Sequence, residues 1–468
     1  TLPEMVGSPD PGCWAQQPDV SVACAAGIPF GTADSLRSTT SSNYAPWALV
    51  LPGLASFVPD AGAYAYLARA LDALIPVLLM ASSLVLWLRR RPVVAAALLA
   101  GTTPIVWFTF GVVNPSAIAI AGGLALWTGQ LVDSERFVGD TAGRVDAERD
   151  RLVDVVAVAG WAALLLARRD GPLWATAIVV ACCALVPCRP VDWWLRLGRL
   201  RWIAVAIVPV TLVPSLQLGD LGFNLLLALT PLLLPAVDRV VVWWRSHPER
   251  AARQAFVGTS VLGVVLVVGA LLTLRPSGFR AETIRLVMSN TGNHLQQLVG
   301  VLGWLDAPVP TSAVFLYWAT LGGLATVALL ERRRSAVVLA LALAATVGTA
   351  WLLELGQGAD YGQYWQGRYS MPFAVGLPVV AAWRISGAGL IDRLTVPLAV
   401  SAWIVLNAGY FAAQRRWAVG IDGTFSPWHW DSWGAPLPPV VLLAAHLAVS
   451  AWLVAIIVSH APRPDVTT

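Results

Sequence analysis

The feature that most constrains this chain is a series of apolar runs, each about 16 to 23 residues long, that recurs along most of its length. An α-helix of about 20 apolar residues spans the hydrocarbon core of a bilayer, so each run is a candidate transmembrane helix. Hydrophobic residues make up 57% of the 468 residues and charged residues only 12%. Because no soluble core could bury so many runs, we predict an all-α, polytopic integral membrane protein.

The boundaries of the runs, marked by Arg, Pro, Gly and Asp, predict about 13 spans. The first five are expected at residues 64–88, 92–110, 114–132, 152–167 and 172–187. The others are expected at 202–216, 221–238, 255–274, 312–330, 335–353, 371–385, 392–413 and 437–459. In an alternative interpretation, residues 202–238 form one span and a re-entrant piece.

The distribution of arginine predicts the orientation. If the N-terminus lies outside and the spans alternate, about two thirds of the basic residues fall on one side, which the positive-inside rule assigns to the cytoplasm. The outward segments are then 1–63, which would include a short interfacial helix, and the loops 275–311, 354–370 and 414–436. Residues 64–459 form the bundle and 460–468 a cytoplasmic tail. We therefore expect the functional face to be extracytoplasmic.

Several classes of function are excluded. The net charge is +4, but the basic residues are scattered between apolar segments without a basic face, so nucleic-acid binding is not expected. The chain has no nucleotide-phosphate loop, no nucleophile elbow and no paired metal-binding histidines.

The cysteines divide into two groups. Cys182, Cys183 and Cys188 lie in or beside an apolar span and are expected to behave as small hydrophobic residues. Cys13 and Cys24 flank an outward polar segment, where an oxidising compartment favours a disulfide; two free thiols are the alternative.

Charged residues near the outer ends of spans require a reason, because charge at membrane depth is costly. Arg69 and Asp72 are three residues apart on one predicted helix face. They could neutralise one another. Alternatively, Arg69 binds a lipid-linked phosphate and Asp72 orients it.

Two further basic sites are candidates for the same chemistry. The stretch YGQYWQGRYSMP places Gln366, Arg368 and Tyr369 together just outside a span, and Arg415 and Arg416 precede a tryptophan. A guanidinium group in such a place either binds a donor phosphate or contacts lipid headgroups. If the bound phosphate carries a sugar, Gln366 and Tyr369 are candidates to contact that sugar or its acceptor.

Residues 292–310 are too polar at their start to cross the membrane and too apolar for solvent, so we predict a helix lying in the outer interface. It would bring His294, Trp304 and Asp306 to the outer surface. Asp306 either ends a turn or serves, with Asp10 of the first segment, as a catalytic base or metal ligand. The chain's 23 Trp residues, Trp87 and Trp428 among them, favour an aromatic belt at span ends, and Trp304 is also a candidate for sugar stacking.

A combination of segments, in order along the chain, resembles a known family. The segments are CWAQQPDVSVAC (13–24), NYAPWALVLPGL (43–54), YLARALDALI (66–75), TPIVWFTFGVVNPSAIAIAGGLALW (103–127), GPLW (171–174), QQLVGVLGWLDAPVP (296–310), QGRYSMP (366–372) and RRWAVG (415–420). They resemble the bacterial membrane family called domain of unknown function two-one-four-two. That family is similar in layout to the GT-C membrane glycosyltransferases.

The resemblance implies a GT-C-like transferase that moves a sugar from a polyprenyl-phosphate donor to an envelope glycan, lipid or protein acceptor. The candidate cofactor is a divalent metal ion. Its partners would be the lipid-linked sugar, membrane lipids and the acceptor. In such enzymes a carboxylate helps the acceptor and arginines stabilise the leaving phosphate. The family's Asp-Glu-x-x-His motif is represented at 7–14 by Asp10 alone, so we expect it upstream of Thr1 or lost. The rival functions are a lipid-linked glycan transporter or flippase and a noncatalytic scaffold.

Overall fold

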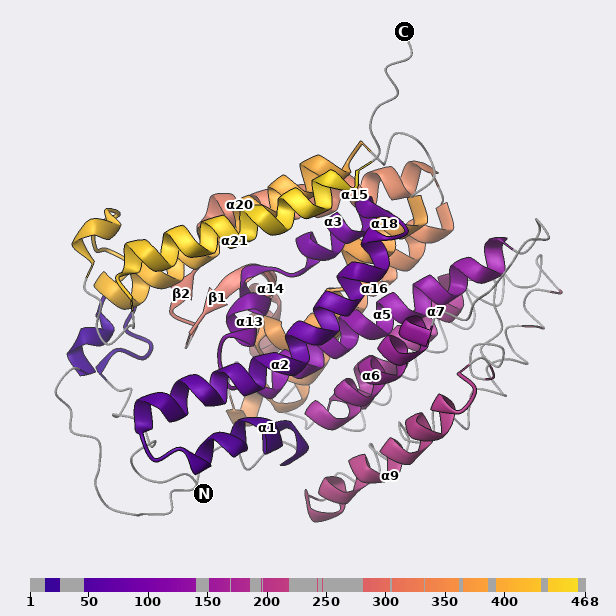
Figure 1. Cartoon of the computed structure of the whole chain (residues 1–468), viewed down its shortest axis with the longest axis horizontal. Helices are drawn as coiled ribbons and strands as arrows, with labels where there is room; N and C mark the ends of the chain where they lie inside the picture. Colours follow the sequence, from indigo (N-terminus) through magenta and orange to yellow (C-terminus); the bar gives the residue numbers. More distant parts are fainter. Residues whose placement is uncertain are drawn as a thin grey trace, which may run out of the picture.

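The computed structural model describes residues 13–25, 46–139, 151–168, 170–185, 195, 197–218, 242, 246, 281–303, 305–331, 333–361, 365–385, 393–430 and 437–461. These residues form a bundle of α-helices with one two-stranded hairpin (Figure 1). The prediction of an all-α polytopic membrane protein is confirmed. The spans expected at 221–238 and 255–274 lie outside the described residues, as do Asp10 and Trp304.

The first half of the chain supplies the helices η3 (Val22–Ala25), η5 (Pro46–Leu49), α1 (Val50–Gly53), η6 (Leu54–Phe57), α2 (Ala61–Leu88), α3 (Pro92–Gly101), α4 (Pro104–Phe110), α5 (Pro115–Gly139), α6 (Arg151–Ala167), α7 (Gly171–Leu185) and α9 (Leu200–Leu218). The second half supplies α13 (Ala281–Ser289), α14 (Thr291–Gly300), α15 (Thr311–Glu331), α16 (Arg333–Tyr361), η9 (Gly367–Tyr369), α17 (Met371–Ala374), α18 (Leu377–Ile385), α20 (Thr395–Val419), η10 (Pro427–His429) and α21 (Pro439–Ser459). The strands are β1 (Val301–Leu302) and β2 (Ala307–Pro308).

Most predicted spans correspond to helices within a few residues. Among the described residues, five helices are long and apolar enough to cross a membrane, namely α2, α5, α15, α20 and α21, and the bent pair α3–α4 would make a sixth. The total of about 13 spans stays a prediction. Two outward loops begin later than expected, because α16 continues to Tyr361 and α20 to Val419.

The predicted span 92–110 is not one straight helix. It breaks after Gly101, and the axes of α3 and α4 differ in direction by 76°. Pro104 at the start of α4 has no N–H, and a residue before proline disfavours helical backbone angles, so the break falls at Thr102–Thr103. The Thr103 hydroxyl donates to the carbonyl of Leu298, at 2.8 Å, which attaches the break to α14.

Helices α2 and α5 run in the same direction. In the first half of α2, the Asp72 carboxylate accepts a hydrogen bond at 3.1 Å from the amide of Asn114, which directly precedes α5. Near the end of α2, the Trp87 indole N–H donates to Thr128 Oγ1 at 3.2 Å. Trp87 is fully buried, so the prediction that it belongs to an interfacial belt is wrong, whereas Trp428 is 76% exposed.

Helix α6 packs closely against α5 through small residues. A Cβ added at Gly160 would lie 2.5 Å from the backbone nitrogen of Leu126 and 2.7 Å from the Gly122 carbonyl oxygen. The absence of a side chain therefore allows the two backbones to approach, which is common where helices associate in membranes.

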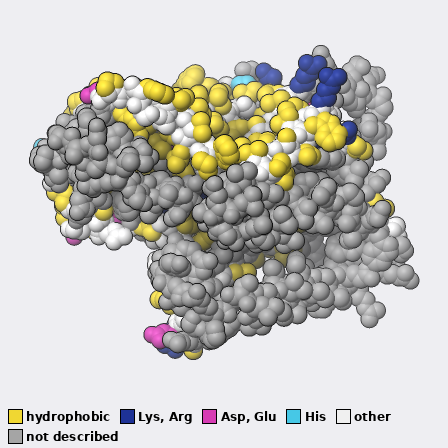
Figure 2. Space-filling model, turned by 90° about the horizontal axis from the view of Figure 1, so that it is seen from below, with side chains coloured by type: hydrophobic (Ala, Val, Ile, Leu, Met, Phe, Trp, Pro, Cys, Tyr) yellow, Lys and Arg dark blue, Asp and Glu magenta, His cyan; other side chains and the backbone are white. Residues whose placement is uncertain are grey.

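The two ends of the bundle differ in charge. At the end where α2 finishes, Arg89 and Arg90 are exposed. Figure 2 shows hydrophobic side chains across the middle of the described surface and basic side chains gathered towards this end, on the right. The β1–β2 hairpin lies at the opposite end of the bundle, on the left in Figure 1.

The segment expected to be one interfacial helix from 292 to 310 is helical only as far as Gly300. There it turns into the β1–β2 hairpin, whose antiparallel pairs are Val301 with Pro308 and Leu302 with Ala307. The helical prediction for 301–310 is wrong. The backbone takes positive φ angles at Gly303 (65°) and Leu305 (63°), and proline at 308 and 310 cannot donate helical hydrogen bonds.

The N-terminal segment is closed by a disulfide between Cys13 and Cys24, as predicted; their Cα atoms are 6.2 Å apart. The short apolar helix Pro46–Phe57 follows in the first segment, where the sequence predicted a short helix. Cys182 is free and buried.

Candidate functional site

Polar side chains form a chain of contacts at the end of the bundle where α5 and α7 begin, which we call the Tyr369 end. Three segments distant in sequence meet there. Ser116 lies in the first turn of α5, Arg168 lies between α6 and α7, and Tyr369 ends η9. The contacts between these three residues build an arginine site.

Arg168 is held in place from several directions. Its Nε donates to Asp170 Oδ1 at 2.7 Å, and its Nη1 donates to Ser116 Oγ at 2.9 Å. Its guanidinium carbon lies 4.3 Å from the centre of the Tyr369 ring, within the range of a cation–π interaction. Asp170 is also fixed, because the Trp174 indole N–H donates to its other oxygen at 3.1 Å. Arg168 is therefore a preorganised cation whose charge Asp170 partly neutralises.

Arg368 brings a second guanidinium group to the same ring, at 5.5 Å from its centre. Among the described residues, no carboxylate forms an ion pair with Arg368. Its Nε is buried and has no hydrogen-bond partner. The sequence predicts that Gln366, Arg368 and Tyr369 lie together, and Gln366 directly precedes η9, which contains the other two. The Gln366 Oε1 atom is likewise buried without a partner.

The turn that carries Arg368 is pinned to α14 and α16. The Gly367 amide donates to Gln297 Oε1 at 2.8 Å, and the Trp365 amide donates to Glu354 Oε1 at 3.2 Å. A Cβ at Gly367 would lie 2.7 Å from the backbone carbon of Gln297, so only glycine fits this contact without displacement. Trp365 is only 7% exposed and packs edge-on against Tyr369, with ring centres 5.3 Å apart.

Behind this turn lies a buried pair of titratable groups. His294 Nε2 lies 3.4 Å from Glu354 Oε1, and their side chains are 4% and 1% exposed. Asn290 Nδ2 is 3.3 Å from the same imidazole nitrogen. Glu354 Oε2 and His294 Nδ1 are buried and have no hydrogen-bond partner.

Arg69 and Asp72 do not neutralise one another. Arg69 is exposed and makes no ion pair among the described residues. Asp72 is 1% exposed, and one of its oxygens caps the backbone at Asn114 while the other has no partner. A spacing of three residues usually places two side chains on the same face of a helix. Here Asp72 points into the bundle, whereas Arg69 points away from it.

Asp306 and Arg416 form a buried ion pair, 2.8 Å from Asp306 Oδ2 to Arg416 Nη2. The Arg416 side chain is fully buried, and its guanidinium also donates to the carbonyl oxygens of Val20, Trp14 and Gln17 at 2.6 to 2.9 Å. The pair therefore clamps the disulfide-closed segment onto α20 and the hairpin. This geometry gives both residues a structural role, and the roles of base and phosphate ligand stay predictions.

Arg415 is committed to a neighbouring loop. Its Nε and Nη2 both donate to the Gly423 carbonyl, at 3.1 and 2.6 Å, and its guanidinium stacks 3.8 Å from the centre of the Phe425 ring. Phosphate binding by Arg415 stays a prediction, but the structure does not bring it into the arginine site around Tyr369.

Two site residues were missed by reasoning from sequence, namely Arg168 and Glu354. The available signal for Arg168 was an Arg-x-Asp-Gly-Pro turn in a short outward connection. Glu354 was assigned to the start of an outward loop, whereas α16 holds it inside the bundle. Among the described residues, no group of three or more His, Cys, Asp and Glu side chains could hold a metal ion.

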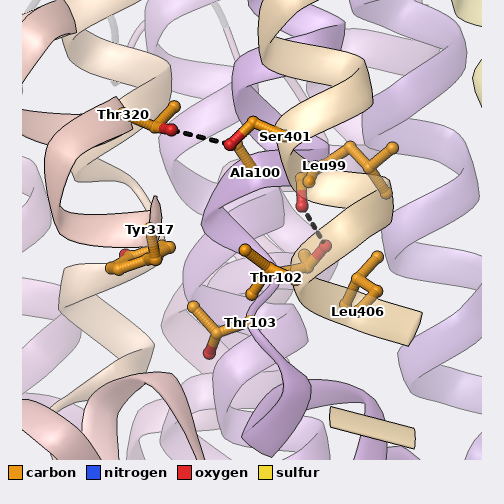
Figure 3. Close-up of a pocket in the computed structure, with 10 residues that line it drawn as sticks. Leu99, Ala100, Thr102, Thr103, Tyr317, Thr320, Ser401 and Leu406 are labelled. Carbon is orange, nitrogen blue, oxygen red and sulfur yellow. Dashed lines mark hydrogen bonds between the residues drawn. The ribbon is translucent and has the colours of Figure 1, made fainter. Parts of the chain in front are cut away.

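A separate pocket lies between α3, α15 and α20, beside the break at Thr102 (Figure 3). Leu99, Ala402 and Leu406 line it together with hydroxyl groups. Two of these, Thr320 and Ser401, are 2.6 Å apart. The pocket has room for about one water molecule, so it is too small for a lipid-linked sugar.

Comparison with known proteins identifies the family. A family model described as "Predicted membrane protein (DUF2142)" matches residues 4–377, which include α2, the Arg168 turn and the whole of η9. The chain belongs to this family. The match confirms the resemblance drawn from sequence, and it ends before α20, which carries Arg415 and Arg416. No curated protein and no solved structure matches the chain. The family description states a membrane location and names no activity.

Proposed function

We propose that this member of the DUF2142 family is a membrane glycosyltransferase of the bacterial cytoplasmic membrane. It takes a sugar from a polyprenyl-phosphate donor and transfers it to an envelope glycan, lipid or protein on the extracytoplasmic side. The observation that carries the proposal is the arrangement of Arg168 and Arg368 around Tyr369, with Arg368 lacking a carboxylate partner among the described residues.

The charges at this site suit a lipid-linked sugar phosphate. A sugar phosphodiester has one negative charge. Of the two guanidinium groups at this site, that of Arg368 has no ion pair with a carboxylate among the described residues, so its positive charge is available to the phosphate. When the sugar leaves, the lipid phosphate becomes a monoester and its negative charge increases. Arg168, fixed by Asp170 and Ser116, is placed to stabilise that additional charge.

The sidedness of the site supports an extracytoplasmic reaction. The Cys13–Cys24 disulfide belongs to an oxidising compartment, and its loop is clamped to the end of α20 that follows Arg416. The exposed Arg89 and Arg90 lie at the C-terminal end of α2, which is the end of the bundle opposite the β1–β2 hairpin. The positive-inside rule assigns that end to the cytoplasm. Gln366, with its unpartnered Oε1, is the proposed sugar contact on the same turn.

The experiment that tests this function measures donor-headgroup binding. The purified chain in lipid nanodiscs is titrated with undecaprenyl phosphate, and separately with the neutral alcohol undecaprenol, while tryptophan fluorescence or thermal stability is recorded. We expect the phosphate, and not the alcohol, to bind. Arg368→Ala should weaken binding about 10- to 150-fold, because a hydrogen bond to a charged group contributes about 1.5–3 kcal/mol.

Arg285→Ala is the matched control, since Arg285 is an exposed arginine on α13. Equal binding of phosphate and alcohol, or no effect of Arg368→Ala, would overturn the assignment of the phosphate site. Transfer itself is tested by offering polyprenyl-phosphate-linked hexoses and pentoses and measuring sugar release to water or to oligosaccharide acceptors. Tight phosphate binding without release of any of these sugars would favour a transporter.

A further inference from the structure

The His294–Glu354 pair is a deeply buried pair of titratable groups beside the turn that carries Arg368. The two side chains come from different helices, α14 and α16, and are 4% and 1% exposed. Burial of a carboxylate and an imidazole is costly unless their hydrogen-bonding groups are satisfied. Here only one polar side-chain atom of each residue, Glu354 Oε1 and His294 Nε2, has a partner.

The unsatisfied side consists of two specific atoms. Glu354 Oε1 accepts the Trp365 amide and faces His294, whereas Glu354 Oε2 and His294 Nδ1 have no partner. A buried polar atom without a hydrogen-bond partner destabilises the folded state. Holding the Trp365 amide needs only one oxygen acceptor, which a glutamine side chain would also supply. The carboxylate therefore exceeds what the fold needs at this position.

The pair is joined to the arginine site through a single short turn. Glu354 holds the amide of Trp365 at the start of this turn, and Arg368 follows three residues later. The Trp365 ring contacts the Tyr369 ring, around which Arg168 and Arg368 lie. One rigid turn thus connects a candidate base to the proposed phosphate ligands.

We propose that Glu354, paired with His294, is the general base of the transfer reaction, an inference that rests on the proposed function. Glu354 takes the proton of the acceptor hydroxyl as the acceptor oxygen forms a bond to C1 of the donor sugar. The bond between C1 and the phosphate oxygen breaks, and its electron pair leaves with the lipid phosphate, which Arg168 and Arg368 hold. Glu354 then passes the proton to the neighbouring imidazole of His294.

Glu354→Gln is the decisive variant because it separates the base from the structural pin. The amide oxygen can still accept the Trp365 N–H at nearly unchanged volume, but the group can no longer take a proton. We expect sugar release from polyprenyl-phosphate-linked hexoses and pentoses to fall about 100-fold or more, which is the usual contribution of a general base. Binding of undecaprenyl phosphate should stay within about threefold of the wild type, because the pinned turn is preserved.

Glu282→Gln is the control for loss of a carboxylate, since Glu282 is exposed on α13. His294→Gln is a second variant, expected to reduce the rate of release by about tenfold or more while binding persists, and it decides the question if Glu354→Gln does not fold. Release at the wild-type rate by either folded variant would overturn the assignment of the base and leave the proposed function standing. A wild-type chain that binds no undecaprenyl phosphate and releases no sugar would overturn both.

Discussion

The clamp between Arg416 and the disulfide-closed segment makes the sharpest prediction about stability. Replacing Arg416 with Met keeps the side chain long and apolar but removes the charge. Asp306 is then left as a buried carboxylate without its cation, and the carbonyls of Trp14, Gln17 and Val20 lose their hydrogen bonds from the guanidinium. Removing one partner of a buried ion pair costs about 3–5 kcal/mol, and we expect the free energy of unfolding to fall by this amount.

A double variant tests the physical reason. Arg416→Met combined with Asp306→Leu leaves no unpaired charge, so it should recover at least about 1 kcal/mol of the loss, with the remainder due to the three carbonyl oxygens. The assay is unfolding by SDS in mixed micelles, supplemented by chymotrypsin cleavage after Trp14. Cleavage there releases a fragment only after reduction, because Cys13 and Cys24 are joined.

Arg285→Met, at an exposed position on α13, provides the baseline for loss of one arginine. If Arg416→Met unfolds within about 0.5 kcal/mol of the wild type, as surface substitutions usually do, the clamp is not what holds the segment. If it leaves stability unchanged but abolishes undecaprenyl phosphate binding, Arg416 is a phosphate ligand, as its sequence context predicted, and the structural explanation is refuted.

Two other substitutions test the contacts around the site. Gly367→Ala should weaken undecaprenyl phosphate binding by about tenfold, because its Cβ would displace the turn from Gln297, whereas Gly292→Ala, which meets nothing within 4 Å, should not; equal affinities would contradict this. Cys13→Ser should lower the free energy of unfolding by about 3 kcal/mol, because it opens a short loop with a sequence separation of 11. A wild-type protein whose Cys13 and Cys24 are alkylated without prior reduction would exclude the disulfide.

The sequence predicted the positions of the helices closely, but it did not predict the bend between α3 and α4 or the end of α14 at Gly300. Apolar length is a property of each segment alone, and α2, α15 and α21 begin and end within a few residues of their predicted spans. The 76° bend at Thr102 and the hairpin after Gly300 depend on how α4 and α14 meet. Proline and glycine marked places where a helix could end, but neighbouring helices determined where it did.

In the candidate site, too, the sequence predicted only the contacts between residues that are close along the chain. Arg368 and Tyr369 are adjacent in sequence, so their common turn was predictable from one short stretch. Arg168 lies about 200 positions earlier and meets Tyr369 only because α6, α7 and η9 converge. The predicted span ended at residue 353, so Glu354 was assigned to an outward loop, whereas α16 continues to Tyr361. No local sequence pattern marks Glu354 as buried.

The sequence by itself determined the membrane class, the approximate spans, the disulfide and the family, since each depends on composition or on residues close along the chain. The tertiary structure alone decided which charges are paired. The sequence makes Arg416 and Arg368 equal candidates for phosphate binding, but the fold places Asp306 and three carbonyls around Arg416 and leaves Arg368 without a carboxylate partner among the described residues. Electrostatic pairing depends on distances between atoms of separate helices, and these distances exist only once the helices have packed.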